Sequence, residues 1–524
     1  MKKVFLVLLG LTVACNSAQQ TTTEKKEEKK GANYDPTPYA QTITQEDLTK
    51  HLYTYASDEF QGRETGQPGQ KKAVNYLKDH YVKMGIPAAK SDGDYFQNVP
   101  LEISSVPGVQ FSVNGKDFTL GKDFATFGGP GNISTGAANV VYAGYGIEDE
   151  KYSDYANLDV KGKVVLIKAG EPKNDDGTYK ISGSSEASKW SNLRQAFNEK
   201  IGLAREKGAK GLLFFDEANF GVIQQQFNFL KNQQNGRISL KSQEKNPFFY
   251  LFVNKDVATA VYPGIESTYS SSTQTADLKV AFESKSKEIS SENVVAYIKG
   301  SEKPNEFLVI SAHLDHEGVK NGEVYNGADD DGSGTVAVLE IAEAFKKAAD
   351  DGNGPKRSVV FLHVTGEEKG LLGSRYYTDN PIFPLESTVA DLNIDMIGRT
   401  DPKREGDRNY VYLIGSDKLS TELHNLSEEV NKKYTNITLD YTYNDENDPN
   451  RFYYRSDHYN FAKNNVPIIF YFNGTHDDYH RPSDTPDKIQ YDLLTNRTKL
   501  VFYTAWEVAN RDKRIIADKA VEAK

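Results

Sequence analysis

Cysteine is nearly absent from this sequence: its 524 residues contain one, Cys15. A single cysteine excludes an intrachain disulfide framework, and with it the class of small folds that disulfides hold together. A chain of this length can instead be stabilised by large hydrophobic cores. A chain this long usually divides into more than one core, so two domains are expected.

An excess of positive charge is also lacking. The formal net charge is −11, and the chain contains no long basic tract. Proteins bind nucleic acids mainly through cationic side chains that neutralise phosphates. We therefore expect no nucleic-acid partner.

Long hydrophobic runs are missing too, and the most apolar stretch is short. Lys2 and Lys3 precede an apolar run from Val4 to Val13. This order is typical of a signal peptide, here residues 1–14, and the run is too short to span a bilayer comfortably. No other segment has the pattern of a transmembrane helix.

The end of this run resembles the lipobox of bacterial lipoproteins, with Thr12 where leucine is usual and Cys15 as the residue to be acylated. The resemblance implies an exported lipoprotein on the periplasmic, outer-membrane or cell-surface side, held to the membrane by a lipid on Cys15. A plain secretory signal cut nearby is the alternative. Residues 15–36 are rich in threonine, lysine and glutamate, which predicts a disordered tether.

The folded chain is expected to consist of one α/β domain in two pieces, interrupted by a β-rich insertion. The first piece, residues 37–115, contains a helix opened by Thr44 and a second helix that ends at Gly85. The insertion, residues 116–290, consists of short β-rich runs bounded by glycines, with a Gln/Asn-rich stretch that is a loop or an exposed helix. The second piece, residues 291–515, alternates strands with helices. This alternation predicts a mostly parallel, mixed sheet flanked by helices.

Residues that bind metals or transfer protons follow several of the predicted strands. In α/β sheets ligands bind at the carboxyl ends of the strands, so these side chains should meet on one rim. Mixed imidazole and carboxylate groups suit Zn²⁺ or a similar divalent ion. The segments that meet there contain His313 and Asp315, the loop GADDDGSG with Asp330, Glu367 and Glu368, Asp395, and His480.

These segments carry a family resemblance. SAHLDH, NGADDDGSGT, VTGEEKGLLGS, NIDMIG, YRSDHYNFA and DYHRPSDTPDKI are similar to the motifs of M28-type zinc aminopeptidases. VYAGYGI, DYANLDVKGKVVLI and REKGAKGLLF more loosely resemble the protease-associated (PA) domain that is inserted in some of them. The resemblance implies the zinc-exopeptidase fold with a PA-like insertion, peptide substrates and two Zn²⁺ ions.

The resemblance also implies roles for individual residues. One zinc would be held by His313 and Asp395, the other by Glu368 and His480, with Asp330 bridging them. Glu367 would be the general base, because a carboxylate that does not ligate metal can accept and return a proton. The carboxylate of Asp315 would fix the tautomer of His313. The peptide bond between Asp330 and Asp331 would be cis.

Other candidates have weaker patterns. Tyr479 would donate a hydrogen bond to the oxyanion, or else is packed. His458 and Arg455 would shape the site or bind substrate. His363 is interpreted as a core histidine. His316 and His476 match no ligand position of the family.

The sequence therefore predicts a secreted or lipid-anchored bimetallic zinc exopeptidase that removes N-terminal amino acids. Three alternatives stay open at this stage. A carboxypeptidase would need a cationic group for the substrate carboxylate, which Arg455 can supply. A glutaminyl-cyclase-like enzyme would share the fold but use one zinc. A non-catalytic receptor or scaffold would have lost ligands, whereas here the five ligand residues and Glu367 are all present.

Overall fold

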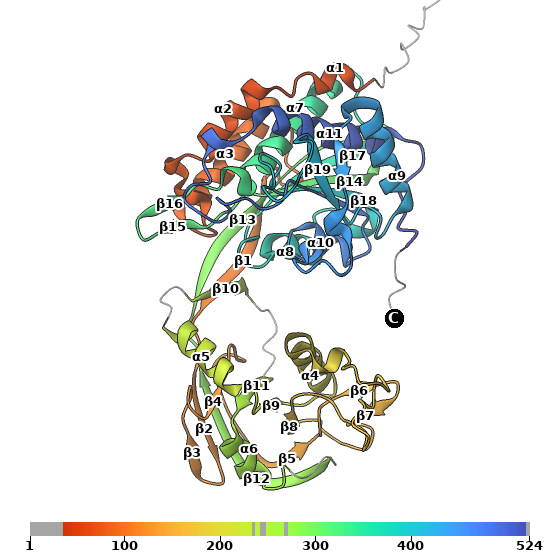
Figure 1. The fold of residues 1–524 in the computed structure, drawn as a ribbon. Helices are drawn as coiled ribbons and strands as arrows, with labels where there is room; N and C mark the ends of the chain where they lie inside the picture. The colour runs from red at the N-terminus through yellow and green to blue at the C-terminus, as the bar shows by residue number, and fades with distance from the viewer. Residues whose placement is uncertain (1–34, 233–235, 242–247, 267–270, 520–524) are drawn as a thin grey trace, which may run out of the picture.

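The computed structural model describes residues 35–232, 236–241, 248–266 and 271–519 (Figure 1). The predicted signal peptide, nearly all of the tether, and Cys15 lie outside these residues. Among the helices of the described segments, none combines the length and apolar character needed to cross a membrane.

The larger body is built on a nine-stranded mixed sheet in the order β10-β1-β13-β17-β14-β18-β21-β19-β20. The four central strands, β17, β14, β18 and β21, are mutually parallel, and most of the outer pairings are antiparallel. The predicted parallel arrangement thus holds for the centre of the sheet. The strands are β1 (Phe96–Ser104), β10 (Arg237–Leu240), β13 (Ser286–Ile298), β14 (Lys303–His313), β17 (Arg357–Val364), β18 (Thr388–Ile394), β19 (Tyr410–Ile414), β20 (Thr438–Asp440) and β21 (Ile468–Phe472).

Helices cover both faces of this sheet (Figure 1). On one face α2, α3, α7 and α11 pack against one another, while α8 and α10 pack together on the other. Strands β17, β18 and β21 are buried on every residue and β14 is buried from Phe307 onward, as expected for a sheet covered on both sides. The helices are α1 (Thr37–Ala40), α2 (Gln45–Tyr55), α3 (Pro68–Met84), α7 (Gly334–Asp350), α8 (Leu372–Asp379), α9 (Thr421–Val430), α10 (His458–Ala462) and α11 (Tyr491–Asn510).

The first of the two long helices, α2, starts after Thr44, and the second, α3, ends at Gly85, as the sequence predicts. The Thr44 side chain accepts a hydrogen bond from the Asp47 backbone N–H at 3.1 Å, which caps α2. Helix α3 starts at Pro68, where no N–H is needed, and ends at Gly85 in the left-handed conformation, with φ of +70°. Both helices place apolar residues such as Leu52 and Leu77 in the main core.

The smaller body is an eight-stranded sheet in the order β3-β2-β12-β5-β8-β9-β11-β4. Its strands are β2 (Gly108–Val113), β3 (Lys116–Phe118), β4 (Phe124–Ala125), β5 (Ile133–Tyr142), β8 (Val164–Lys168), β9 (Gly211–Phe215), β11 (Phe249–Val253) and β12 (Ser272–Glu283). Three helices accompany it, α4 (Leu193–Glu206), α5 (Phe220–Lys231) and α6 (Lys255–Val261). Short hairpins complete the molecule, β6–β7 (Glu148–Asp149, Tyr152–Ser153) and β15–β16 (Gly318–Lys320, Glu323–Tyr325).

The strands locate the limits of the insertion more closely than the sequence does. The second sheet begins with β2, before residue 116, because β2 pairs with β12. Strand β10 lies inside the predicted insertion but pairs with β1 in the first sheet. The Gln/Asn-rich stretch forms α5, a helix that buries Ile223 and Phe227 in a core of the second body while Val222 and Phe229 face solvent. Whether the second sheet is of the PA type stays a prediction.

Candidate metal centre

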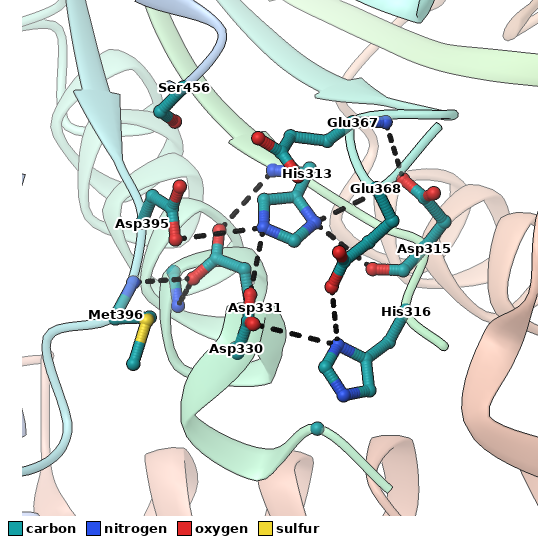
Figure 2. A network of polar contacts seen from close by, with 12 residues as sticks. His313, Asp315, His316, Asp330, Asp331, Glu367, Glu368, Asp395, Met396 and Ser456 are labelled. Carbon is teal, nitrogen blue, oxygen red and sulfur yellow. Dashed lines mark hydrogen bonds and ion pairs between the residues drawn. The ribbon is translucent and has the colours of Figure 1, made fainter. Parts of the chain in front are cut away.

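The predicted ligands come together at the carboxyl ends of the central strands (Figure 2). His313 is the last residue of β14, Asp395 directly follows β18, and Glu367 and Glu368 follow β17. These strands are parallel neighbours, so their ends lie on the same rim. His480, on the segment after β21, closes the group from the side.

Asp330 occupies the middle of this group. Its Oδ1 lies 3.2 Å from Nε2 of His313, and its Oδ2 lies 3.0 Å from Nε2 of His480. Asp395 Oδ1 lies 3.6 Å from the same nitrogen of His313, while Glu368 Oε2 lies 3.1 Å from the same nitrogen of His480. The five side chains therefore form two sets that share the Asp330 carboxylate.

The chemistry of these atoms fits metal ions. Buried polar atoms in proteins normally have hydrogen-bond partners. Yet His313 Nε2, Asp330 Oδ2 and Glu368 Oε1 are buried without a hydrogen-bond partner among the described residues. Three carboxylates facing two imidazoles at this spacing need cations to balance them, and the donor types are those that bind zinc. The residues present thus fit a metal centre.

The orientation of His313 corrects one predicted role. Its Nδ1 donates to the backbone carbonyl oxygen of Asp315 at 3.0 Å, while the nearer carboxylate oxygen of Asp315 is 3.9 Å away. The main chain at Asp315, rather than its side chain, therefore holds the tautomer that turns Nε2 toward the centre.

The Asp315 carboxylate has different partners. Oδ1 accepts the backbone N–H of Glu367 at 3.1 Å, and Oδ2 accepts the Thr65 hydroxyl at 2.7 Å. Asp315 is fully buried. It thus fixes the main chain of the predicted general base to the segment that follows β14.

The three adjacent aspartates have separate tasks. Asp331 accepts backbone N–H groups from His313, Gly334 and Met396. Asp329 accepts the N–H of Gly398 at 2.6 Å. The Asp330–Asp331 peptide bond is cis, as predicted. Two of the carboxylates therefore bind the loop to neighbouring elements, and the third faces the metal centre.

Sequence reasoning missed several residues that hold this loop in place. The fully buried Arg63 donates to the carbonyl oxygens of Leu314, Asn326 and Gly327. Asp484 accepts the backbone N–H groups of Asp329 and Asp330. Arg63 precedes α3 and Asp484 lies in DYHRPSDTPDKI, but nothing in the spacing of either residue indicates what it contacts.

Burial tunes the predicted general base. Removal from water, together with the neighbouring carboxylate of Glu368, raises the pKa of the Glu367 carboxyl well above its usual value, although His313 opposes this shift. A higher pKa brings a carboxyl group closer to the range in which it exchanges protons at neutral pH. Glu367 lines a pocket with Asp330 and Asp395.

Two of the three weaker candidates also line this pocket. Tyr479 stacks on His480 with ring centroids 3.9 Å apart, and Nη2 of the exposed Arg455 lies 3.4 Å from the Tyr479 hydroxyl. His458 instead lies behind the pocket wall, stacked on Phe470, with Nε2 2.8 Å from the Tyr453 carbonyl oxygen. Phe470 and three further apolar residues, Met396, Phe452 and Phe472, also line the pocket.

Three further histidines were considered in the sequence. His363 is a core residue, and His316 and His476 are neighbours of the site. His363 is buried in β17, where its Nε2 meets the Tyr81 hydroxyl at 2.7 Å and burial lowers its pKa to about 3. This is the core position that was predicted. His476 Nε2 lies 3.1 Å from Asp329, and His316 lies directly beside Glu368 (Figure 2).

Comparison with known proteins agrees with this geometry. Residues 293–505 match the model for peptidase family M28. An aminopeptidase of Pseudomonas aeruginosa is 26% identical over 347 residues, 64% of this chain and 54% of that protein. A probable leucine aminopeptidase of Trichophyton verrucosum is 31% identical over 215 residues, 40% of this chain and 55% of that protein. The chain thus spans about half the length of these two relatives. A solved aminopeptidase from Aneurinibacillus sp. strain AM-1 is 19% identical, covers 92% of this chain and 98% of its own, and has a TM-score of 0.48.

The ligand-type side chains on the rim of the mixed sheet lie within residues 293–505, the part of the chain that is similar to peptidase family M28.

Proposed function

We propose that the protein is a two-zinc exopeptidase that removes N-terminal amino acids from peptides. The observation that supports this most strongly is the Asp330 carboxylate, which presents one oxygen to His313 and the other to His480. A carboxylate in this position can bridge two cations about 3.5–4 Å apart. The names of the two sequence relatives, an aminopeptidase and a probable leucine aminopeptidase, favour the same activity.

In this proposal His313 and Asp395 hold one zinc, Glu368 and His480 hold the other, and Asp330 is shared. When bound, the two ions polarise the scissile carbonyl and lower the pKa of water from 15.7 toward about 7. The protein's own residues complete the reaction. Glu367 takes the proton that the water loses and passes it to the leaving amine, while the Tyr479 hydroxyl donates to the carbonyl oxygen as negative charge develops there.

The pocket beside the centre suggests which substrates fit. Its lining includes the apolar side chains of Met396, Phe452, Phe470 and Phe472. Such a wall stabilises an apolar side chain by removing it from water. We therefore propose a preference for peptides whose first residue is apolar, with the free α-amine among the carboxylates of the centre.

One observation favours a second candidate. Arg455 is exposed at the same pocket, and a guanidinium group there can bind the carboxylate of a substrate's C-terminus. The names of the two sequence relatives, by contrast, favour removal of the N-terminal residue. Aminopeptidase activity is therefore the primary proposal, and carboxypeptidase activity the alternative.

Three substrates separate these activities: leucine p-nitroanilide, its N-acetylated form, and an N-acetylated dipeptide with a free carboxylate. We expect hydrolysis of the first only. Activity should vanish after treatment with a chelator and return with Zn²⁺. Cleavage of the acetylated dipeptide at a comparable rate would favour the carboxypeptidase, and turnover that resists the chelator would contradict a metal-dependent mechanism.

We also propose that the protein is exported and anchored by a lipid on Cys15, which rests on the sequence alone. In a bacterial host, Cys15→Ser should abolish labelling by a clickable fatty acid and leave the precursor uncleaved. A mature N-terminus located downstream of Cys15 in the wild-type protein would contradict the anchor.

A further inference from the structure

His316 is a buried histidine to which neither the family pattern nor the proposed mechanism gives a task. It follows His313 by three residues and is fully buried. Neither of its ring nitrogens has a hydrogen-bond partner among the described residues. A buried polar group that is left unpaired destabilises the folded state. A side chain with two such nitrogens therefore needs an explanation in its surroundings.

Those surroundings are the second half of the metal centre. Nδ1 of His316 lies 2.9 Å from Oε1 of Glu368 and 3.8 Å from Oδ2 of Asp330 (Figure 2). The 2.9 Å approach to Glu368 does not have the direction of a hydrogen bond, because neither atom is satisfied by it. Two atoms that lie close without pointing at each other are typical of ligands directed at a common third point.

The same point is approached by His480 from the other side. Nε2 of His480 lies 3.1 Å from Oε2 of Glu368 and 3.0 Å from Oδ2 of Asp330. The two imidazole rings have centroids 5.7 Å apart and an interplanar angle of 73°. Glu368 is therefore flanked by one imidazole on each carboxylate oxygen.

These separations match the ligands of one ion. Zinc bonds to nitrogen and oxygen of about 2.0–2.1 Å, arranged tetrahedrally, place neighbouring ligand atoms roughly 3.3 Å apart. The four separations that join His316 or His480 to Glu368 and Asp330 run from 2.9 to 3.8 Å around that value. Nδ1 of His316 is buried and unpaired, as is Nε2 of His313, the predicted ligand of the other ion.

We infer that His316 binds metal through Nδ1, as a further ligand of the ion held by Glu368, His480 and Asp330. The inference rests on the proposed function, because it requires that ion. The ion near Glu368 would then have two imidazole ligands and the ion near His313 only one. Since imidazole is a favoured ligand of zinc, the site that contains His316 should hold its ion more tightly than it would without this side chain.

Two variants of His316 test this, with His363→Asn as the matched control, since His363 is equally buried but lies in the core with one hydrogen bond to Tyr81. His316→Asn keeps a polar atom close to the position of Nδ1, and His316→Leu removes it. Thermal unfolding in the presence of a chelator shows whether each variant folds.

Zinc content is measured in buffers of defined free Zn²⁺, and X-ray absorption counts the imidazoles bound to zinc. We expect two zinc ions and three bound imidazoles in the wild-type protein and in His363→Asn. In His316→Leu one zinc should dissociate at a free Zn²⁺ concentration at least tenfold higher, with two imidazoles left in the spectrum. His316→Asn should also show two imidazoles, with a smaller loss of affinity.

The outcomes separate the inference from the proposed function. If the wild-type protein binds two zinc ions, but both His316 variants keep the same affinity and imidazole count, the inference is wrong and the proposed function stands. If His316→Leu weakens zinc while the wild-type spectrum contains two imidazoles, His316 acts by positioning Glu368 and is not a ligand. If the wild-type protein binds no zinc, both fail together.

Discussion

The carboxylate of Asp315 offers a sharp test because the structure gives it a different task from the one the sequence implies. It accepts the backbone N–H of Glu367 and the hydroxyl of Thr65, while the imidazole of His313 is held by the Asp315 main chain. Replacing Asp315 with alanine removes both acceptors and leaves the His313 contact in place. We therefore expect Asp315→Ala to impair turnover while leaving zinc bound.

The size of the effect follows from the lost contacts. An unpaired, buried N–H at Glu367 costs about 1–3 kcal/mol, which corresponds to roughly 5- to 150-fold in rate if the cost falls on the catalytic geometry. Asp315→Asn should lose less, because an amide oxygen can still accept from Glu367 while its NH₂ group donates to Thr65. Thr65→Ser, which keeps the hydroxyl, should be nearly neutral, whereas Thr65→Ala should resemble a mild Asp315 variant.

The assay measures kcat and KM with leucine p-nitroanilide, and zinc per chain, for the same preparations. The account predicts a fall in kcat at constant zinc content, in the order Asp315→Ala, then Asp315→Asn. Loss of zinc from Asp315→Ala in proportion to activity would instead mean that the carboxylate orients His313. Unchanged kcat in Asp315→Ala would mean that the Glu367 segment needs no such support.

Three further predictions concern single side chains. Glu367→Gln should retain zinc but lose about 10²–10⁴-fold in kcat, because an amide cannot accept and return a proton; near wild-type turnover would exclude it as the base. Tyr479→Phe should lower kcat by about 10²–10³-fold with little change in KM, and an effect on KM alone would make this residue a binding group. Burial raises the pKa of Glu340 to about 8, above the value of about 4.3 in an unfolded chain, so the contribution of this side chain to wild-type stability should fall as pH rises from about 4 to 8. Glu340→Gln should therefore be more stable than wild type by a few kcal/mol at pH 8 and equally stable near pH 4, and equal denaturant midpoints at both pH values would contradict this.

Much of the site was predictable because strand ends are visible in the sequence. Buried strands such as that ending at His313 have continuous apolar runs, and the sheet then brings their ends to one rim. The role of Asp315 was misassigned because sequence spacing does not distinguish a backbone carbonyl from the carboxylate of the same residue. Arg63 could not be found at all, since its partners are backbone atoms some 250 residues away in the chain.

The limits of the insertion were less predictable for a related reason. Strand β10 lies in the part of the sequence that forms the second sheet, but it pairs with β1 in the first sheet. The choice of this partner depends on tertiary contacts rather than on the composition of either strand. His316 matched no ligand position in the family pattern, so only its burial and its distance from Glu368 bring it into the site.

The central claim is that Asp330 joins two metal ions, and zinc-edge anomalous diffraction from crystals of the zinc-loaded protein tests it most directly. The account predicts two anomalous peaks about 3.5–4 Å apart, one beside His313 and Asp395, the other beside Glu368 and His480, with Asp330 between them. Crystals of Asp330→Ala should lack both peaks, whereas those of Asp329→Asn should keep them. A single peak in the wild-type protein, or two peaks that do not contact Asp330, would contradict the account.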